Sequence, residues 1–201
     1  MSISLEKGQR ISLEKNGSAL DKVCVGVNWG VIEKKGFFGK KKVAVDLDAS
    51  VSLHDEDNKM TDLVYFRQLK SKDGSIKHSG DDLTGDLDGD DGLDNEIITI
   101  QLNKVPKNVN KLAIILNSFQ GQDFASIPFA SVRLYEGTAS RVDSVMADYN
   151  IANEPKFNGS VSMVLGTLYR HNAEWKFRAI GEPTLDRKIK ETVDTVIRDF
   201  L

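Results

Sequence analysis

Hydrophobic and polar residues alternate in short segments along most of the chain, and turn-forming residues separate these segments. Alternation with a period of two predicts β-strands that have one buried and one polar face. The clearest case is residues 43–53, where one face carries only Val, Leu and Ala while the other carries Asp46 and Asp48. The repeated pattern therefore predicts a protein built mainly from β-strands.

Further strands are predicted along the whole chain, and they fall at residues 23–28, 62–69, 97–102, 111–119, 130–136, 160–170 and 175–181. Residues 2–5 and 10–13 predict an N-terminal hairpin, and residues 142–149 fit either a strand or a loop. Residues 111–119 form a nearly continuous apolar run, which favours a central strand. Many short strands with regularly spaced turns are typical of an antiparallel β-sandwich.

The hydrophobic period changes only at the C-terminal end. From Leu185 to Phe200 the apolar residues recur at helical spacing, and Pro183 stands at a position suited to the start of a helix. We expect an amphipathic helix over residues 183–200 that covers its own domain. Residues 1–201 then form one all-β domain, an antiparallel β-sandwich with a C-terminal amphipathic helix.

Composition limits the function classes that fit this chain. Its 201 residues carry a net charge of −3, and no apolar segment is long enough for a signal peptide or a membrane span. We therefore expect a cytoplasmic protein without the basic surface that nucleic-acid binding requires. Cys24 is the single cysteine, which excludes an internal disulfide, and we expect it to be buried. No nucleotide-binding, zinc-binding or catalytic motif identifies an enzyme or a small-molecule substrate.

One segment departs strongly from the alternating pattern. Residues 80–97 contain seven Asp, one Glu and four Gly, without Lys or Arg. Two carboxylates about 5 Å apart repel by roughly 3 kcal/mol at an effective dielectric of about 20, and glycine lets a backbone turn tightly enough to gather them. Such a segment either stays solvated or folds around a hard cation such as Ca²⁺, which takes about six to eight oxygen ligands.

Two neighbouring patterns favour the metal-binding interpretation. In the strand that follows, Glu96 shares a face with Ile98 and Ile100. If that face is buried, the carboxylate needs a cation or a proton. Asp46 and Asp48 are unusual residues for a strand, and we expect them to hold the same cations as the acidic segment.

The acidic segment does not match an EF-hand. When Asp86 is taken as the first position, Asp91 stands where that motif needs glycine, and Glu96 falls one residue early. His78 lies just ahead of the segment. Because hard cations prefer oxygen, we expect His78 at the surface or in a supporting role.

A second charged segment, residues 33–42, contains five lysines around Phe37 and Phe38. It is suited to contact with an anionic membrane, a phosphate or an acidic partner. The simpler interpretation, which we favour, is an exposed hairpin whose lysines prevent pairing with other strands.

Several motifs together resemble the TerD family of tellurite-resistance and chemical-stress proteins. They are LEKGQRISLEK at 5–15, DLDASVSL at 46–53, VYF with a following Leu at 64–69, DGSIKHSGDDLTGDLDGDD at 73–91, ASVRLY at 130–135 and LYRHNAEWKFRAIGE at 168–182. The resemblance covers most of the chain in order. It implies a β-sandwich that carries calcium in an acidic cleft, has no established enzymatic activity, and acts with other Ter proteins near the inner membrane.

The resemblance also implies metal ligands. Its strand motif falls on Asp46 and Asp48, and its loop motif on Asp81, Asp82 and the later acidic residues. Two departures from the family pattern stand out. Residues 89–96 replace a compact GDDE run, so the ligands there are Asp90 and Asp91, or Asp94 and Glu96, or a mixture of the two pairs. Residues 27–30 lack an Asp found in a Gly-Trp-Asp turn. The full set of candidate ligands is Asp46, Asp48, Asp81, Asp82, Asp88, Asp90, Asp91, Asp94 and Glu96.

The sequence thus predicts a non-enzymatic, calcium-binding stress protein that holds more than one Ca²⁺ ion. Ordering of the acidic segment by the ions would create a surface for other Ter-family proteins. Two alternatives stay open. The carboxylates would suit a metal-dependent phosphoester hydrolase, and residues 33–42 would suit calcium-dependent binding to an anionic membrane, with peripheral association at the inner membrane.

Overall fold

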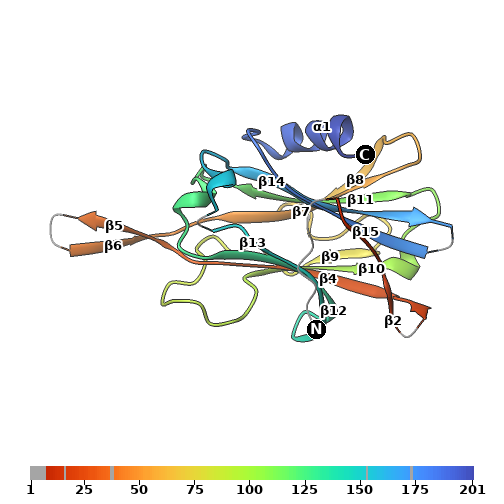
Figure 1. Cartoon of the computed structure of the whole chain (residues 1–201), viewed down its shortest axis with the longest axis horizontal. Coiled ribbons are helices and arrows are strands. Elements are labelled where there is room, and N and C mark those ends of the chain that lie inside the picture. The colour runs from red at the N-terminus through yellow and green to blue at the C-terminus, as the bar shows by residue number, and fades with distance from the viewer. Residues whose placement is uncertain (1–7, 16, 37–38, 153, 173) are drawn as a thin grey trace.

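The computed structural model describes residues 8–15, 17–36, 39–152, 154–172 and 174–201. Two antiparallel sheets face each other (Figure 1), which confirms the predicted β-sandwich. Among the described residues, the first sheet has the strand order β1 (Arg10–Ser12), β15 (Glu174–Thr184), β14 (Ser162–His171), β11 (Lys111–Ser118), β7 (Leu47–His54) and β8 (Met60–Val64). The second has the order β13 (Arg141–Asn150), β12 (Ala130–Thr138), β4 (Lys22–Trp29), β10 (Glu96–Gln101) and β9 (Ile76–His78).

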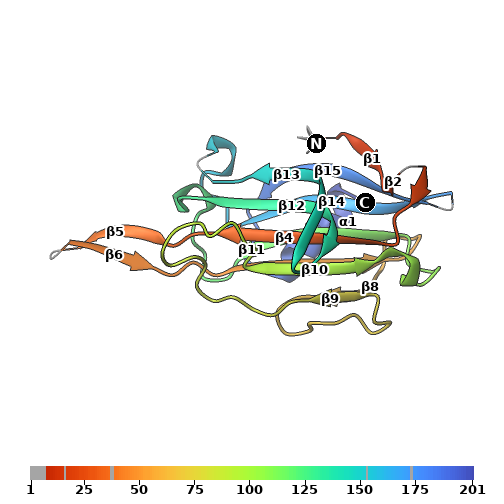
Figure 2. The ribbon, with the colours of Figure 1, turned by 90° about the horizontal axis from the view of Figure 1, so that it is seen from below.

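Two short hairpins extend from the sandwich. β2 (Glu14–Lys15) pairs with β3 (Ser18–Ala19), and β5 (Ile32–Gly36) pairs with β6 (Gly39–Val43). The second hairpin projects beyond one end of the body (Figure 2), which confirms the exposed hairpin expected there; the role of its lysines stays a prediction. Its tip, Phe37 and Phe38, lies outside the described residues, as does the first strand of the predicted N-terminal hairpin at 2–5. The second strand of that predicted N-terminal hairpin is present as β1, at residues 10–12, and it pairs with β15.

The hydrophobic core lies between the sheets, and the strand pattern explains it. In β10, Ile98 and Ile100 are fully buried, and in β4 the alternate residues Val23, Val25 and Val27 meet them from the neighbouring strand of the same sheet. Three short 3₁₀ helices lie in the connections: η1 (Leu102–Lys104), η2 (Phe124–Ser126) and η3 (Pro155–Phe157). No helix of the described chain is long and apolar enough to cross a membrane.

Helix α1 (Ile189–Asp199) forms a third layer on the outer face of the first sheet (Figure 1). Its Val193 and Val196 pack against Ala113 and Ile115 of β11. The predicted helix start at residue 183 is wrong, because β15 continues to Thr184. Pro183 pairs with Met163 of β14 but lies beyond the segment of β15 that pairs with β1, and a strand with one unpaired side tolerates proline.

The predicted strand at residues 43–53 also needs correction. It begins only at Leu47, and both of its faces are buried, although alternation predicts one solvated face. The serines and His54 on the polar face have essentially no exposed surface, since the helix layer covers this side of the first sheet. Asp48 faces its strand partner Asn117, which donates a hydrogen bond to Thr192 of α1. Burial therefore extends to side chains that the pattern assigns to solvent.

Candidate metal centre

The site begins at a gap in the edge of β7. β8 pairs with β7 only from Val51 onward, so the edge at Ala49 has no strand beside it. Two side chains from the second sheet fill this gap. The Ala49 N–H donates to Glu96 Oε2 at 2.8 Å, and His78 Nε2 lies 3.2 Å from the Ala49 carbonyl oxygen. The buried face predicted for Glu96 is confirmed, because this residue has no exposed surface.

His78 supports Glu96 without bringing a charge to it. The Gly80 N–H donates to His78 Nδ1 at 3.1 Å, so Nδ1 is an acceptor and the ring is neutral with its proton on Nε2. Nε2 lies 3.4 Å from Glu96 Oε2. The residue is buried, which corrects the surface alternative and leaves the supporting role. Glu96 thus has hydrogen-bond donors but no cationic partner among the described side chains, which is costly for a buried carboxylate.

Three aspartates meet beside Glu96. Asp46 lies just before β7, Asp48 lies in it, and Asp81 comes from the acidic segment. One carboxylate oxygen of each lies within 4.8 Å of the others. We call these three residues the strand–loop group. Asp46 and Asp48 are buried, and Asp46 Oδ1 has no hydrogen-bond partner. An orphaned, buried carboxylate oxygen next to other carboxylates matches what a cation needs from a protein site.

The electrostatics of the strand–loop group are unfavourable without a counter-charge. Burial, followed by the neighbouring carboxylates, raises the pKa of Asp46 to about 6 and that of Asp48 to about 8. These neighbours include Asp81 and Glu96. Ionising the whole group in the buried setting is therefore disfavoured, and either protons or a cation must compensate it.

A second group forms within the acidic segment itself. Asp86, Asp90 and Asp91, here called the loop group, also each place one oxygen within 4.8 Å of the others. Asn28 Nδ2 donates to Asp90 Oδ1 at 2.9 Å, while Asn28 Oδ1 is buried without a partner. Donation by the Gly92 N–H and by Asn28 lowers the pKa of Asp90. Asp86 was not among the predicted ligands, although its spacing to Asp90 and Asp91 across Gly89 was a usable signal.

The acidic segment is folded against the body, and Trp29 anchors it. The Asp86 N–H donates to the Trp29 carbonyl at 2.9 Å, and the Trp29 N–H donates to Asn95 Oδ1 at 2.8 Å. Gly85 sits on the indole with φ +69°, and a Cβ there would lie 2.5 Å from the ring. Glycine is therefore required for both the turn and the close approach. These contacts fix both ends of the segment to the body, while residues 87–93 between them are exposed.

Asp82 holds the turn that precedes Gly85. Its Oδ1 accepts hydrogen bonds from the N–H groups of Thr84 and Gly85 at 2.9 and 3.0 Å, and from the Thr84 hydroxyl. Burial alone would raise the pKa of Asp82, but these hydrogen bonds lower it below its ordinary value. The Asp82 N–H also donates to Glu96 Oε1 at 3.3 Å. The residue thus links the folded turn to the strand–loop group.

Besides Asp82 and Glu96, two more predicted ligands lie outside both groups, and each of them pairs with a cation. Asp94 is buried and forms an ion pair with Arg133 at 2.9 Å, and its carboxylate rests directly on Gly26. Asp88 is exposed and contacts Lys42 at 2.9 Å. The acidic segment has no basic residue of its own, so its cationic partners come from β12 and β6. A phosphoester hydrolase would need a free Lys or Arg to bind the substrate phosphate. Arg133 and Lys42 do not offer this, because each is already paired with an aspartate.

The donor set of both groups consists of oxygen. Carboxylate, amide and backbone oxygens suit the hard cations Ca²⁺ and Mg²⁺. A flexible, glycine-rich segment fits the tolerant geometry of Ca²⁺ better than the strict octahedron of Mg²⁺. Asp46, Asp48 and Asp81, with Glu96 behind them, would hold such an ion at the sandwich, and the loop group would hold one further out.

The sequence places the chain among known proteins. A family model described as the TerD domain matches residues 1–194. This chain belongs to the TerD family. It is similar to the stress response protein SCP2 of Bacillus subtilis (strain 168), with 38% identity covering 98% of this chain and 100% of the relative. It is also similar to the tellurium resistance protein TerZ of Serratia marcescens, with 36% identity and the same coverage.

Solved structures support the fold of this TerD-family protein. The crystal structure of a homologue of the telluride resistance protein TerD from Streptomyces coelicolor A3(2) aligns with a TM-score of 0.65 and 17% identity, covering 85% of this chain and 94% of that chain. A crystal structure of a protein of unknown function gives a TM-score of 0.68 at 20% identity, covering 86% and 95%. The two sequence relatives named above are a stress response protein and a tellurium resistance protein.

Proposed function

We propose that this protein is a non-enzymatic calcium-binding member of the tellurite and chemical-stress resistance system. One Ca²⁺ ion binds at the strand–loop group with Glu96 behind it, and a second binds at the loop group. The bound ions neutralise the acidic segment and fix its shape as a surface for other Ter-family proteins. We place this activity in the cytoplasm, where a site for calcium must bind tightly or respond to changes in concentration.

One observation carries the proposal. Asp46 and Asp48 of a strand and Asp81 of a distant segment converge within 4.8 Å, and a buried oxygen of Asp46 has no hydrogen-bond partner. Acidic residues that only serve solubility would repel one another and separate. Their convergence next to a buried Glu96, which has no cationic partner among the described side chains, supports a bound cation as the missing element.

Calorimetric titration of Ca²⁺ into chelator-treated protein tests the proposal. We expect saturable binding and a calcium-dependent rise in melting temperature. In Asp46→Asn, calcium binding at the strand–loop group and the part of the stabilisation that this ion provides should both be lost. Asp57→Asn is the matched control, because it removes the same charge from an exposed turn. Absence of binding heat at millimolar calcium, or equal loss of binding in the control, would refute the proposed site.

A further inference from the structure

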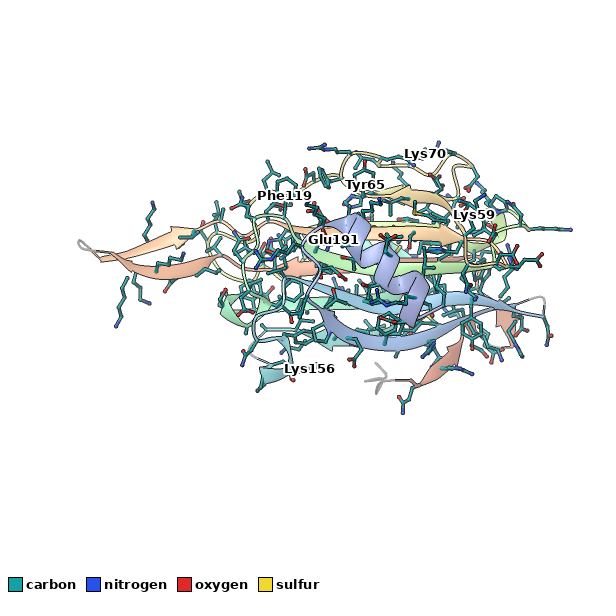
Figure 3. The ribbon with its side chains drawn as sticks, turned by 90° about the horizontal axis from the view of Figure 1, so that it is seen from above. Lys59, Tyr65, Lys70, Phe119, Lys156 and Glu191 are labelled. Atoms are coloured by element: carbon teal, nitrogen blue, oxygen red, sulfur yellow. The ribbon has the colours of Figure 1, made fainter. Side chains whose placement is uncertain are left out.

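A hollow of about 410 Å³ opens next to Asp48, between the first sheet and the start of α1. Its lining comes from the end of β11, from the turn after β8, and from the residues that lead into the helix. Figure 3 shows Tyr65 and Phe119 near the end of the helix where Glu191 is labelled. The volume is in the range of pockets that take a ligand or an anchoring side chain.

Three aromatic rings form one wall of this pocket. Tyr65 and Gln68 exchange backbone hydrogen bonds, which leaves Phe66 and Arg67 at the tip of a tight turn. The Phe66 ring stacks edge-on with Tyr65 at 5.3 Å and with Phe119 at 5.4 Å. Phe119 nevertheless stays 58% exposed. Tyr65 and Phe66 are half-buried, so Phe119 is the exposed edge of this aromatic cluster. Exposed apolar surface of this kind often marks a binding site.

The polar groups of the pocket are incompletely paired. Asn117 is 8% exposed; its Nδ2 donates to Thr192, but its buried Oδ1 has no partner. Asp48 lines the same pocket, and it is buried beside its strand partner Asn117. Buried polar atoms without partners cost free energy, and this cost falls when a ligand pairs them.

Cations surround the mouth of the pocket. Arg67 lies over the Phe66 ring at 5.2 Å, and Arg187 and Lys188 come from the segment that enters α1. The side chains of Arg187 and Lys188 are exposed and form no ion pair with another described residue. Three cations next to an aromatic wall are complementary to a ligand that combines acidic groups with an apolar side chain.

We propose that this pocket binds an acidic peptide segment of a partner protein through an aromatic or aliphatic anchor, and that calcium at the strand–loop group controls the affinity. The anchor packs against Phe66 and Phe119, and the acidic groups meet the cations at the mouth. Asp48 belongs to both the pocket and the strand–loop group, so a cation bound at that group adds positive charge beside the pocket and favours an acidic ligand there. This coupling rests on the proposed calcium site.

The test uses a blocked hexapeptide with a central phenylalanine flanked by acidic residues. We expect calorimetry to show binding that is about tenfold tighter in saturating calcium than in chelator. A peptide with alanine in place of the phenylalanine, and one with amides in place of the carboxylates, should each bind about tenfold more weakly. The protein variants Phe119→Ala and Lys188→Glu, both at exposed positions, should weaken peptide binding to a similar extent and leave calcium binding without peptide unchanged.

Calcium titration without peptide separates the two proposals. One outcome is that calcium binds while the acidic peptide either fails to bind or binds equally well in calcium and in chelator. In that case the pocket proposal is wrong and the calcium site stands. If calcium does not bind, both fail. A second copy is the other possible occupant, because the acidic segment carries Leu87 and Leu93 at 50% and 67% exposure. A calcium-loaded dimer in sedimentation that the peptide does not disperse would overturn the partner-peptide proposal.

Discussion

The substitution Asp48→Asn should stabilise the ion-free protein and remove its response to calcium. Burial and neighbouring carboxylates raise the pKa of Asp48 to about 8 in the folded state, against 3.8 for an ordinary aspartate. Between these values the folded protein holds a proton that the unfolded chain has lost. Stability of the ion-free protein therefore falls as pH rises from about 4 to about 8. Asparagine has nearly the same shape and does not ionise, so it removes this fall.

The magnitude follows from the pKa difference. Each pH unit over which the two states differ by one proton is worth about 1.4 kcal/mol, which gives about 4 kcal/mol at pH 7. Solvent screening in the neighbouring pocket reduces this to about 3 kcal/mol. For a chain of this size the melting temperature of Asp48→Asn should exceed that of the wild type by about 6–12 °C at pH 7 in chelator. The difference should vanish near pH 4.

Thermal unfolding followed by circular dichroism from pH 4 to pH 8, in chelator and in calcium, checks this prediction. Asp57→Asn is again the control and should follow the wild type throughout. Calcium should abolish the downward slope of the wild type, because the ion replaces the proton, and calcium binding should release protons that calorimetry in different buffers detects. A wild-type melting temperature in chelator that stays level from pH 5 to pH 8, or an asparagine variant no more stable than the wild type, would refute the reasoning.

Three further predictions concern the segment around the site. Gly85→Ala should lower stability by about 2 kcal/mol or more and speed amide exchange in the acidic segment, because a Cβ would lie 2.5 Å from the Trp29 ring at φ +69°; an unchanged melting temperature would contradict the anchoring role. Arg133→Ala should cost about 3 kcal/mol by leaving buried Asp94 unpaired, and adding Asp94→Asn should restore much of this loss in denaturant unfolding. Asp88→Asn should change stability by less than about 0.5 kcal/mol and leave the calcium titration intact, since its side chain is 97% exposed.

The sequence predicts the fold and the inner part of the candidate site well, because both depend on local periodicity. Alternation in β10 is enough to place Glu96 on the buried face, and the spacing of Asp46 and Asp48 is enough to put them side by side. The pairing of Asp94 with Arg133 has no such signal. It depends on the register that sets Arg133 opposite Gly26 in the neighbouring strand and on the missing side chain of that glycine, where the Asp94 carboxylate rests. Local sequence patterns do not determine the register between distant strands, so they cannot predict contacts that depend on it.

Burial of the polar face of β7 was also not predictable from the strand itself. The alternation of Ser50 and Ser52 with apolar residues is that of a solvated face, yet both are buried beside Ile115 and Ala113 of β11, on which α1 packs. The helix was predicted, but the face of the sandwich that it covers was not, since an amphipathic pattern defines the buried side of a helix and not its partner.

The closure of the β7 edge at Ala49 has a consequence for aggregation. An open stretch of backbone at the rim of a sheet invites a strand from another molecule to add to it. Here the carboxylate of Glu96 and the imidazole of His78 occupy the two backbone groups that such a strand would use. Replacing Glu96 by an apolar residue would therefore expose a template for intermolecular pairing, and such a variant should be lost to insoluble β-rich assemblies even where its sandwich still folds.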